Sequence, residues 1–155
     1  MNETYLGDTT VRLLVPSRRQ DGGIISSELR AEWESRSRSR LEKLFGGATP
    51  TAVIGAFQHH DGRCTREEIV VLSAACSRET LLAETTRQDV LTFAGEMCAA
   101  LGQESIFVGW GDQSYIVSKA FAPNDVPVIR FLSLPSATQI PHLTMGWAGI
   151  DAPSK

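Results

Sequence analysis

Hydrophobic and polar positions repeat with two different periods between residues 11 and 119, and these periods predict the secondary structure. Short runs rich in apolar and β-branched residues, bounded by proline, glycine or polar turns, predict strands at 11–15, 51–57, 65–75, 105–110 and 114–119. Two longer segments have apolar residues at helical spacing. The first, at 27–45, carries Leu29, Trp33 and Leu41 on one stripe, with a polar Ser37 in the gap. The second begins at Ser77 or Thr80 and ends at Leu101.

The order of these elements predicts the fold class. It reads strand, helix, strand, strand, helix, strand, with one strand added at the C-terminal side. This order is typical of an α+β, ferredoxin-like split βαβ fold (βαββαβ plus an extra C-terminal strand). We therefore expect a two-layer sandwich with both helices on one face of an antiparallel sheet, and we assign residues 1–120 to this domain.

The composition changes in residues 121–155, which contain five of the seven prolines. One short strand is predicted at 128–134, and the rest is too rich in proline for regular structure. Leu143, Met145 and Trp147 are nevertheless too apolar for an unattached tail. We expect this Pro-rich C-terminal segment to pack on the sheet or on a partner.

The strands at 51–57 and 65–75 are apolar on both faces, which has a consequence for assembly. If Asp61-Gly62 forms a two-residue turn, Val53 lies opposite Val70 and Gly55 lies opposite Glu68. Helices cover only one face of a two-layer sandwich, so the other face needs a second cover. The sequence therefore predicts a homodimer through the sheet face, with the C-terminal segment as the alternative cover.

Composition and charge exclude several classes of protein. The 155 residues are 42% hydrophobic and carry a net charge of −3, so we expect one domain and no general affinity for nucleic acid. The first ten residues lack the basic and apolar parts of a signal peptide, and no apolar run is long enough to span a bilayer. The three cysteines have no metal-binding or redox spacing. We expect a cytoplasmic protein with no membrane association, no metal and no cofactor.

The densest charge cluster on a predicted central strand is Arg66-Glu67-Glu68. A charge near a partly buried surface needs a partner, and a structural ion pair of Glu68 or Glu104 with Arg66 or Arg12 would supply one. The alternative is a pocket in which Arg66 binds an anion while Glu67 or Glu68 acts as a general base, with His59 as a proton carrier.

A second group of polar and aromatic candidates flanks the strand at 105–110. Gln103 and Glu104 precede it and Trp110 ends it. These residues are expected either to cap backbone groups or to stand at a pocket mouth. In the second case Arg66, Glu68, Gln103, Glu104 and Trp110 would bind a ligand together.

The linear order of four motifs resembles an uncharacterised family of small bacterial α+β domains. That family carries FGG-T, G-x-W, R-E and G-Q-E-S motifs, with no known activity. The matching stretches here are Leu44-Phe45-Gly46-Gly47-Ala48-Thr49, Gly55-Ala56-Phe57, Arg66-Glu67 and Leu101-Gly102-Gln103-Glu104-Ser105. Phe57 stands where the family has Trp, and the segment after 120 has no counterpart. The resemblance implies the split βαβ fold and leaves the function open.

Three functional hypotheses follow from these residues. The favoured one is a non-enzymatic binding domain for a small, anionic or nucleotide-like ligand or a protein partner at a sheet-face pocket. The second is a small dimeric α+β enzyme that uses a Glu general base on a small-molecule substrate. The third is a protein-interaction module that docks through its C-terminal segment.

Overall fold

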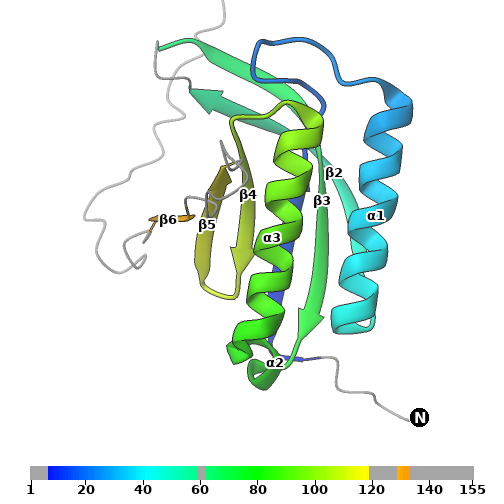
Figure 1. The fold of residues 1–155 in the computed structure, drawn as a ribbon, viewed down its shortest axis with the longest axis vertical. Coiled ribbons are helices and arrows are strands. Elements are labelled where there is room, and N and C mark those ends of the chain that lie inside the picture. The colour runs from blue at the N-terminus through cyan, green and yellow to red at the C-terminus, as the bar shows by residue number, and fades with distance from the viewer. Residues whose placement is uncertain (1–6, 59–61, 119–128, 133–155) are drawn as a thin grey trace, which may run out of the picture.

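A six-stranded antiparallel sheet organises the chain. The computed structural model describes residues 7–58, 62–118 and 129–132. The elements are β1 (Thr9–Val15), α1 (Ser27–Phe45), β2 (Thr49–Gln58), β3 (Cys64–Cys76), α2 (Arg78–Leu82), α3 (Glu84–Leu101), β4 (Ser105–Trp110), β5 (Gln113–Ser118) and β6 (Ile129–Leu132). The strand order is β2-β3-β1-β4-β5-β6. Figure 1 shows α1 and α3 on the same face of the sheet. The α+β class is confirmed, but the strand order differs from a plain βαββαβ sheet because β5 and β6 extend it beyond β4.

Helix α1 begins and ends where the sequence predicts. The hydroxyl of Ser26 accepts a hydrogen bond from the backbone N–H of Leu29 at 3.3 Å, which satisfies one free donor of the first turn. Hydrogen bonds from its own backbone N–H and from the Ser27 and Ser26 side chains lower the pKa of Glu28. The helix ends at Gly46, whose φ of 84° is left-handed.

The second predicted helix is interrupted, which the sequence did not indicate. Ser77 caps α2 by accepting from Thr80 N at 3.2 Å, but Ala83 is extended (ψ 110°) and α3 starts after it. In a continuous helix the carbonyl of Leu81 would accept from residue 85. Here it accepts instead from the indole N–H of Trp110 at 2.9 Å. A side chain of β4 therefore satisfies the carbonyl that the interruption leaves without a partner in the helix.

The hydrophobic core lies between the helices and the sheet. Trp33 of α1 and Phe93 of α3 are both 3% exposed, and their ring centroids are 5.5 Å apart. Beneath them, alternate residues of the central strands are buried and face the helices. The buried strand residues of this layer are Val11, Leu13, Val15, Val70, Leu72, Ala74, Cys76, Ile106, Val108, Trp110, Tyr115 and Val117.

The predicted register of β2 and β3 is wrong by one residue. Val53 pairs with Ile69 and Gly55 pairs with Glu67, where Val70 and Glu68 were predicted. A shift of one residue changes which side chains of β2 share a face of the sheet with a given side chain of β3. In the observed register Gln58 pairs with Cys64, so five residues separate the paired ends of β2 and β3 where a two-residue turn was predicted.

Residues 129–132 place a small part of the C-terminal segment on the sheet, because β6 pairs antiparallel with β5. The remainder of residues 121–155 lies outside the described residues. None of the helices in the described part of the chain combines the length and apolar character that crossing a membrane requires.

Candidate functional site

The two glutamates predicted on β3 contact different parts of the structure. Oε2 of Glu67 accepts hydrogen bonds from the backbone N–H groups of Ser17 and Arg18, each at 3.0 Å. Glu68 forms an ion pair with Arg30 of α1 at 3.0 Å, not with the predicted Arg66 or Arg12. Since successive strand residues alternate between faces, the two carboxylates do not converge on one point. Arg66 is exposed and shares the helix-facing side with Glu68.

The other predicted ligand-binding residues are divided between the two ends of β4. The side-chain amide N–H of Gln103 donates to the backbone carbonyl of Arg18, so it holds the same segment as Glu67. Glu104 is exposed beside it. Trp110 lies at the other end of β4, about 17 Å along the strand. Within one chain, the structure therefore does not bring Trp110 together with the remaining candidates. His59 lies outside the described residues.

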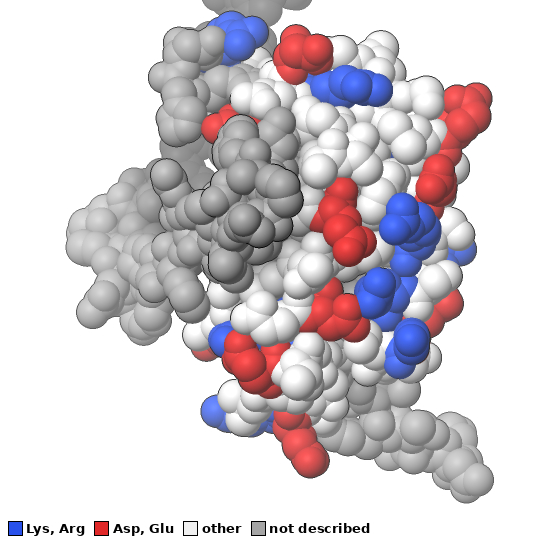
Figure 2. All heavy atoms as spheres, viewed as in Figure 1, with Lys and Arg blue, Asp and Glu red and all other residues white. Residues whose placement is uncertain are grey.

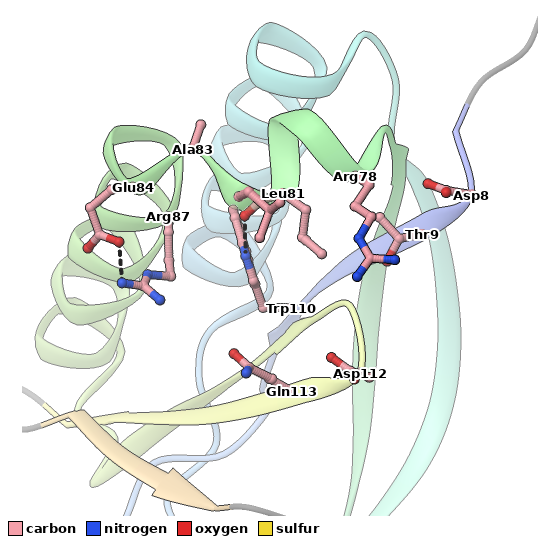
Figure 3. Close-up of a pocket in the computed structure, with 11 residues that line it drawn as sticks. Asp8, Thr9, Arg78, Leu81, Ala83, Glu84, Arg87, Trp110, Asp112 and Gln113 are labelled. Carbon is pink, nitrogen blue, oxygen red and sulfur yellow. Dashed lines mark hydrogen bonds and ion pairs between the residues drawn. The ribbon is translucent and has the colours of Figure 1, made fainter.

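A pocket of about 490 Å³ lies at the Trp110 end of the sheet. It opens between α2, the first turn of α3, the start of β1 and the turn between β4 and β5 (Figure 3). This volume is in the range of small-molecule sites. Its lining residues are Asp8, Thr9, Arg78, Leu81, Leu82, Ala83, Glu84, Arg87, Trp110, Asp112 and Gln113. Of these, Trp110 alone is a site residue predicted from the sequence.

Trp110 lines the pocket, and Gly111 follows it in the turn between β4 and β5. The Trp110 ring is 3% exposed and meets Phe45 edge-on, with centroids 6.1 Å apart. Gly111 has a φ of +63°, and a Cβ there would lie 2.8 Å from Leu81 Cδ2 and 3.2 Å from Thr9 Oγ1. The left-handed backbone of this turn and its closeness to α2 therefore both favour glycine.

A chain of polar contacts, the Arg87 network (Glu84, Arg87, Tyr115 and Gln113), borders the pocket at α3. Arg87 forms an ion pair with Glu84 and donates to the hydroxyl of Tyr115 at 3.4 Å. Tyr115 is 1% exposed, and its O–H donates to Oε1 of Gln113 at 2.9 Å. The hydrogen bond from Arg87 lowers the pKa of Glu84, and the same bond raises the pKa of Arg87.

Three charged side chains gather at the other end of the pocket. Figure 3 shows Asp8 and Arg78 near each other, with Asp112 across from them on the β4–β5 turn. None of the three forms a hydrogen bond or ion pair with another described residue. The pocket lining has three carboxylates and two guanidinium groups, so its net charge is −1. Such a lining suits a ligand that is itself charged and carries a net positive charge.

A second hollow, of about 340 Å³, lies over α1 and contains Arg36, Arg40, Lys43 and Phe93. Its arginines are already engaged, because Arg36 lies 3.9 Å from the centroid of the Trp33 ring and Arg40 pairs with Asp89 at 2.6 Å. Figure 2 shows acidic and basic side chains interspersed on this face. Across the described residues, no group of three or more His, Cys, Asp or Glu side chains could hold a metal ion.

Two solved structures share this fold. One is a phage SAM lyase in its apo state, with a TM-score of 0.56 and 18% sequence identity, covering 79% of this chain and 98% of the lyase. The other is a phage SAM lyase in complex with S-methyl-5'-thioadenosine, with a TM-score of 0.54, 17% identity and the same coverage. The chain matches no protein-family model and no curated protein sequence.

The likeness to SAM lyases corrects the functional hypothesis. At this identity it establishes the fold alone, but the fold is one on which two enzyme structures are built. The expectation of a non-enzymatic binding domain was therefore wrong, as was the preference against catalysis. The enzyme hypothesis, which was the second of the three, is better supported than the binding-domain hypothesis.

Proposed function

We propose that this chain is an enzyme that cleaves a carbon–sulfur bond of a sulfonium nucleoside such as S-adenosylmethionine (SAM). The observation that carries the proposal is the pocket of about 490 Å³ with a net charge of −1, in a fold shared with SAM lyases. SAM carries a sulfonium, an ammonium and a carboxylate, so its net charge of about +1 complements this lining. The alternating charges of Asp8, Arg78 and Asp112 fit the ammonium and carboxylate of its amino-acid part.

The reaction requires a carboxylate base. When SAM loses its aminocarboxypropyl group by elimination, the electrons of the carbon–sulfur bond pass to sulfur, giving the neutral thioether S-methyl-5'-thioadenosine. A proton leaves Cβ of the amino-acid part, which is bonded to the carbon that carried sulfur, and a carboxylate accepts it. The electrons of that C–H bond form the carbon–carbon double bond of the second product, 2-aminobut-3-enoate. Asp8 and Asp112 suit this role because neither is held by another described residue.

Glu67 is the second candidate for the base, as predicted from the sequence. One of its oxygens, Oε2, is fixed by two backbone N–H groups, while Oε1 accepts no hydrogen bond from any described residue. A carboxylate anchored through one oxygen presents the other in a defined direction. The use of Glu67 would place the reaction at the opposite end of the sheet from the pocket.

Product formation tests both the activity and its location. Purified protein is incubated with SAM, and S-methyl-5'-thioadenosine is quantified by liquid chromatography. We expect turnover by the wild type and a loss of about 100-fold or more in Asp112→Asn or Asp8→Asn, as for removal of a general base. Asp89→Asn, which alters a carboxylate outside the pocket, is the matched control.

The same assay separates the two candidate bases. If Glu67→Gln alone abolishes turnover while the pocket variants retain it, the lyase activity stands and its assignment to the pocket is wrong. A wild-type protein that forms no S-methyl-5'-thioadenosine above the uncatalysed background refutes the proposed function.

We also propose that β1 to β4 with α1 and α3 form a split βαβ unit. The order β2-β3-β1-β4 within the larger sheet supports this interpretation, with β5 and β6 as additions at one edge.

A further inference from the structure

We infer that Tyr115 is a positioning residue, which orients the side-chain amide of Gln113 so that its nitrogen faces the bound nucleoside. This inference rests on the proposed function. It concerns two residues two positions apart on β5, which therefore point to the same side of the strand. Gln113 lines the pocket, whereas Tyr115 is buried behind it beneath the first turns of α3.

The direction of the hydrogen bonds determines which end of the amide is held. A guanidinium group can only donate, so the phenol oxygen of Tyr115 accepts from Arg87. The phenol hydrogen is then directed to Oε1 of Gln113, at 2.9 Å. With its carbonyl oxygen held in this way, the amide points its NH₂ group away from Tyr115. Arg87 is itself fixed by Glu84, so the orientation originates in the first turn of α3.

The place of Gln113 in the pocket indicates what this NH₂ group meets. Figure 3 shows Asp8 and Arg78 at one end of the pocket and Glu84 and Arg87 at the other, with Gln113 between them. The first end suits the charged amino-acid part of the substrate, which leaves the nucleoside near Gln113. A neutral N–H donor there would bind an acceptor atom of the base or ribose.

The affinity for S-methyl-5'-thioadenosine, measured by titration calorimetry, tests the inference. Tyr115→Phe removes the hydroxyl and keeps the ring, so we expect Kd to rise about three- to tenfold, the effect of one hydrogen bond. Gln113→Leu should weaken binding by a similar or larger factor. If Tyr115 acts through Gln113, the double variant binds no more weakly than Gln113→Leu alone, because the two effects are not additive.

Two further variants separate positioning from a general structural role. Ser114→Ala changes the intervening β5 residue, which points to the opposite face, and it should leave Kd unchanged. Gln113→Glu keeps an acceptor for Tyr115 but removes the N–H donor, so it should weaken binding as Gln113→Leu does. This variant keeps the test decisive even if Tyr115→Phe does not fold.

The outcomes distinguish the inference from the proposed function. If the wild type binds S-methyl-5'-thioadenosine but Tyr115→Phe binds equally well, or the two effects multiply in the double variant, the inference is wrong and the proposed function stands. Binding by Gln113→Glu with wild-type affinity also overturns the inference. A wild type that neither binds S-methyl-5'-thioadenosine nor cleaves SAM overturns the proposed function, and the inference falls with it.

Discussion

At the scale of single residues, the sequence indicated which charges need partners but not which partners they find. Glu68 on a central strand was expected to pair with Arg66 or Arg12, and it pairs with Arg30 of α1. Glu67 accepts hydrogen bonds from backbone N–H groups of Ser17 and Arg18, about fifty positions away in the sequence. A pattern of residue types contains no information on which loop carbonyls or amides come within reach, so these partners appear only once the chain is folded.

The ion pair between Glu84 and Arg87 gives a pH prediction at the same scale. Arg87 lowers the pKa of Glu84 below its ordinary value of 4.5, so the ionised carboxylate stabilises the folded state above that pH. This contribution disappears as the pH falls through the lowered pKa. We expect Glu84→Gln to lower Tm at about pH 7, by an amount that shrinks as the pH is lowered through the acidic range below 4.5. Glu96→Gln, at an exposed position of the same helix, is the control in thermal unfolding. A difference in Tm that persists unchanged at the acidic pH would contradict the prediction.

At the scale of elements, periodicity predicted nearly every segment but missed the interruption at Ala83. The bounds of α1 and β4 agree with the predicted ranges, because caps and turns beside them are local in sequence. The interruption is different, because neither glycine nor proline marks it. It is compensated by the Trp110 N–H, which reaches the Leu81 carbonyl from another element. The pocket forms at this interruption, which explains why the sequence identified Trp110 but not its neighbours.

A substitution at Gly111 tests whether the β4–β5 turn tolerates a side chain. Its left-handed φ and the closeness of Leu81 both disfavour a side chain. We expect Gly111→Ala to lower the free energy of unfolding by about 1–2 kcal/mol, measured by urea denaturation. Gly47→Ala is the control, because a Cβ at Gly47 would have no atom within 4 Å and the φ of this residue is not left-handed. Equal stability of the two variants would show that the turn tolerates a side chain.

At the scale of the whole molecule, the strand order decides which distant segments meet. Antiparallel pairing of β1 with β3 and with β4 brings the start of β1, the end of β3 and the end of β4 to the same end of the sheet. The residues that line the pocket come from the start of β1, the end of β4 with the turn that follows it, and the helices that follow β3. Predicting this pocket from the sequence would have required knowing both the interruption between α2 and α3 and the order of the strands in the sheet. The motif resemblance to an uncharacterised bacterial family stays a prediction.

The sheet face opposite the helices gives a final prediction, the homodimer. Leu14, Val71 and Ile116 alternate with core residues, so they lie on this outer face, where each is half-buried. A second copy packed on this face would remove their apolar surface from water. We expect a dimeric mass in light scattering at micromolar concentration, and a monomeric mass for Val71→Lys, with folding checked by circular dichroism. Ile24→Lys, at a position 74% exposed before α1, should leave the mass dimeric. A monomeric wild type would refute dimerisation, and a dimeric Val71→Lys would place the interface elsewhere on the molecule.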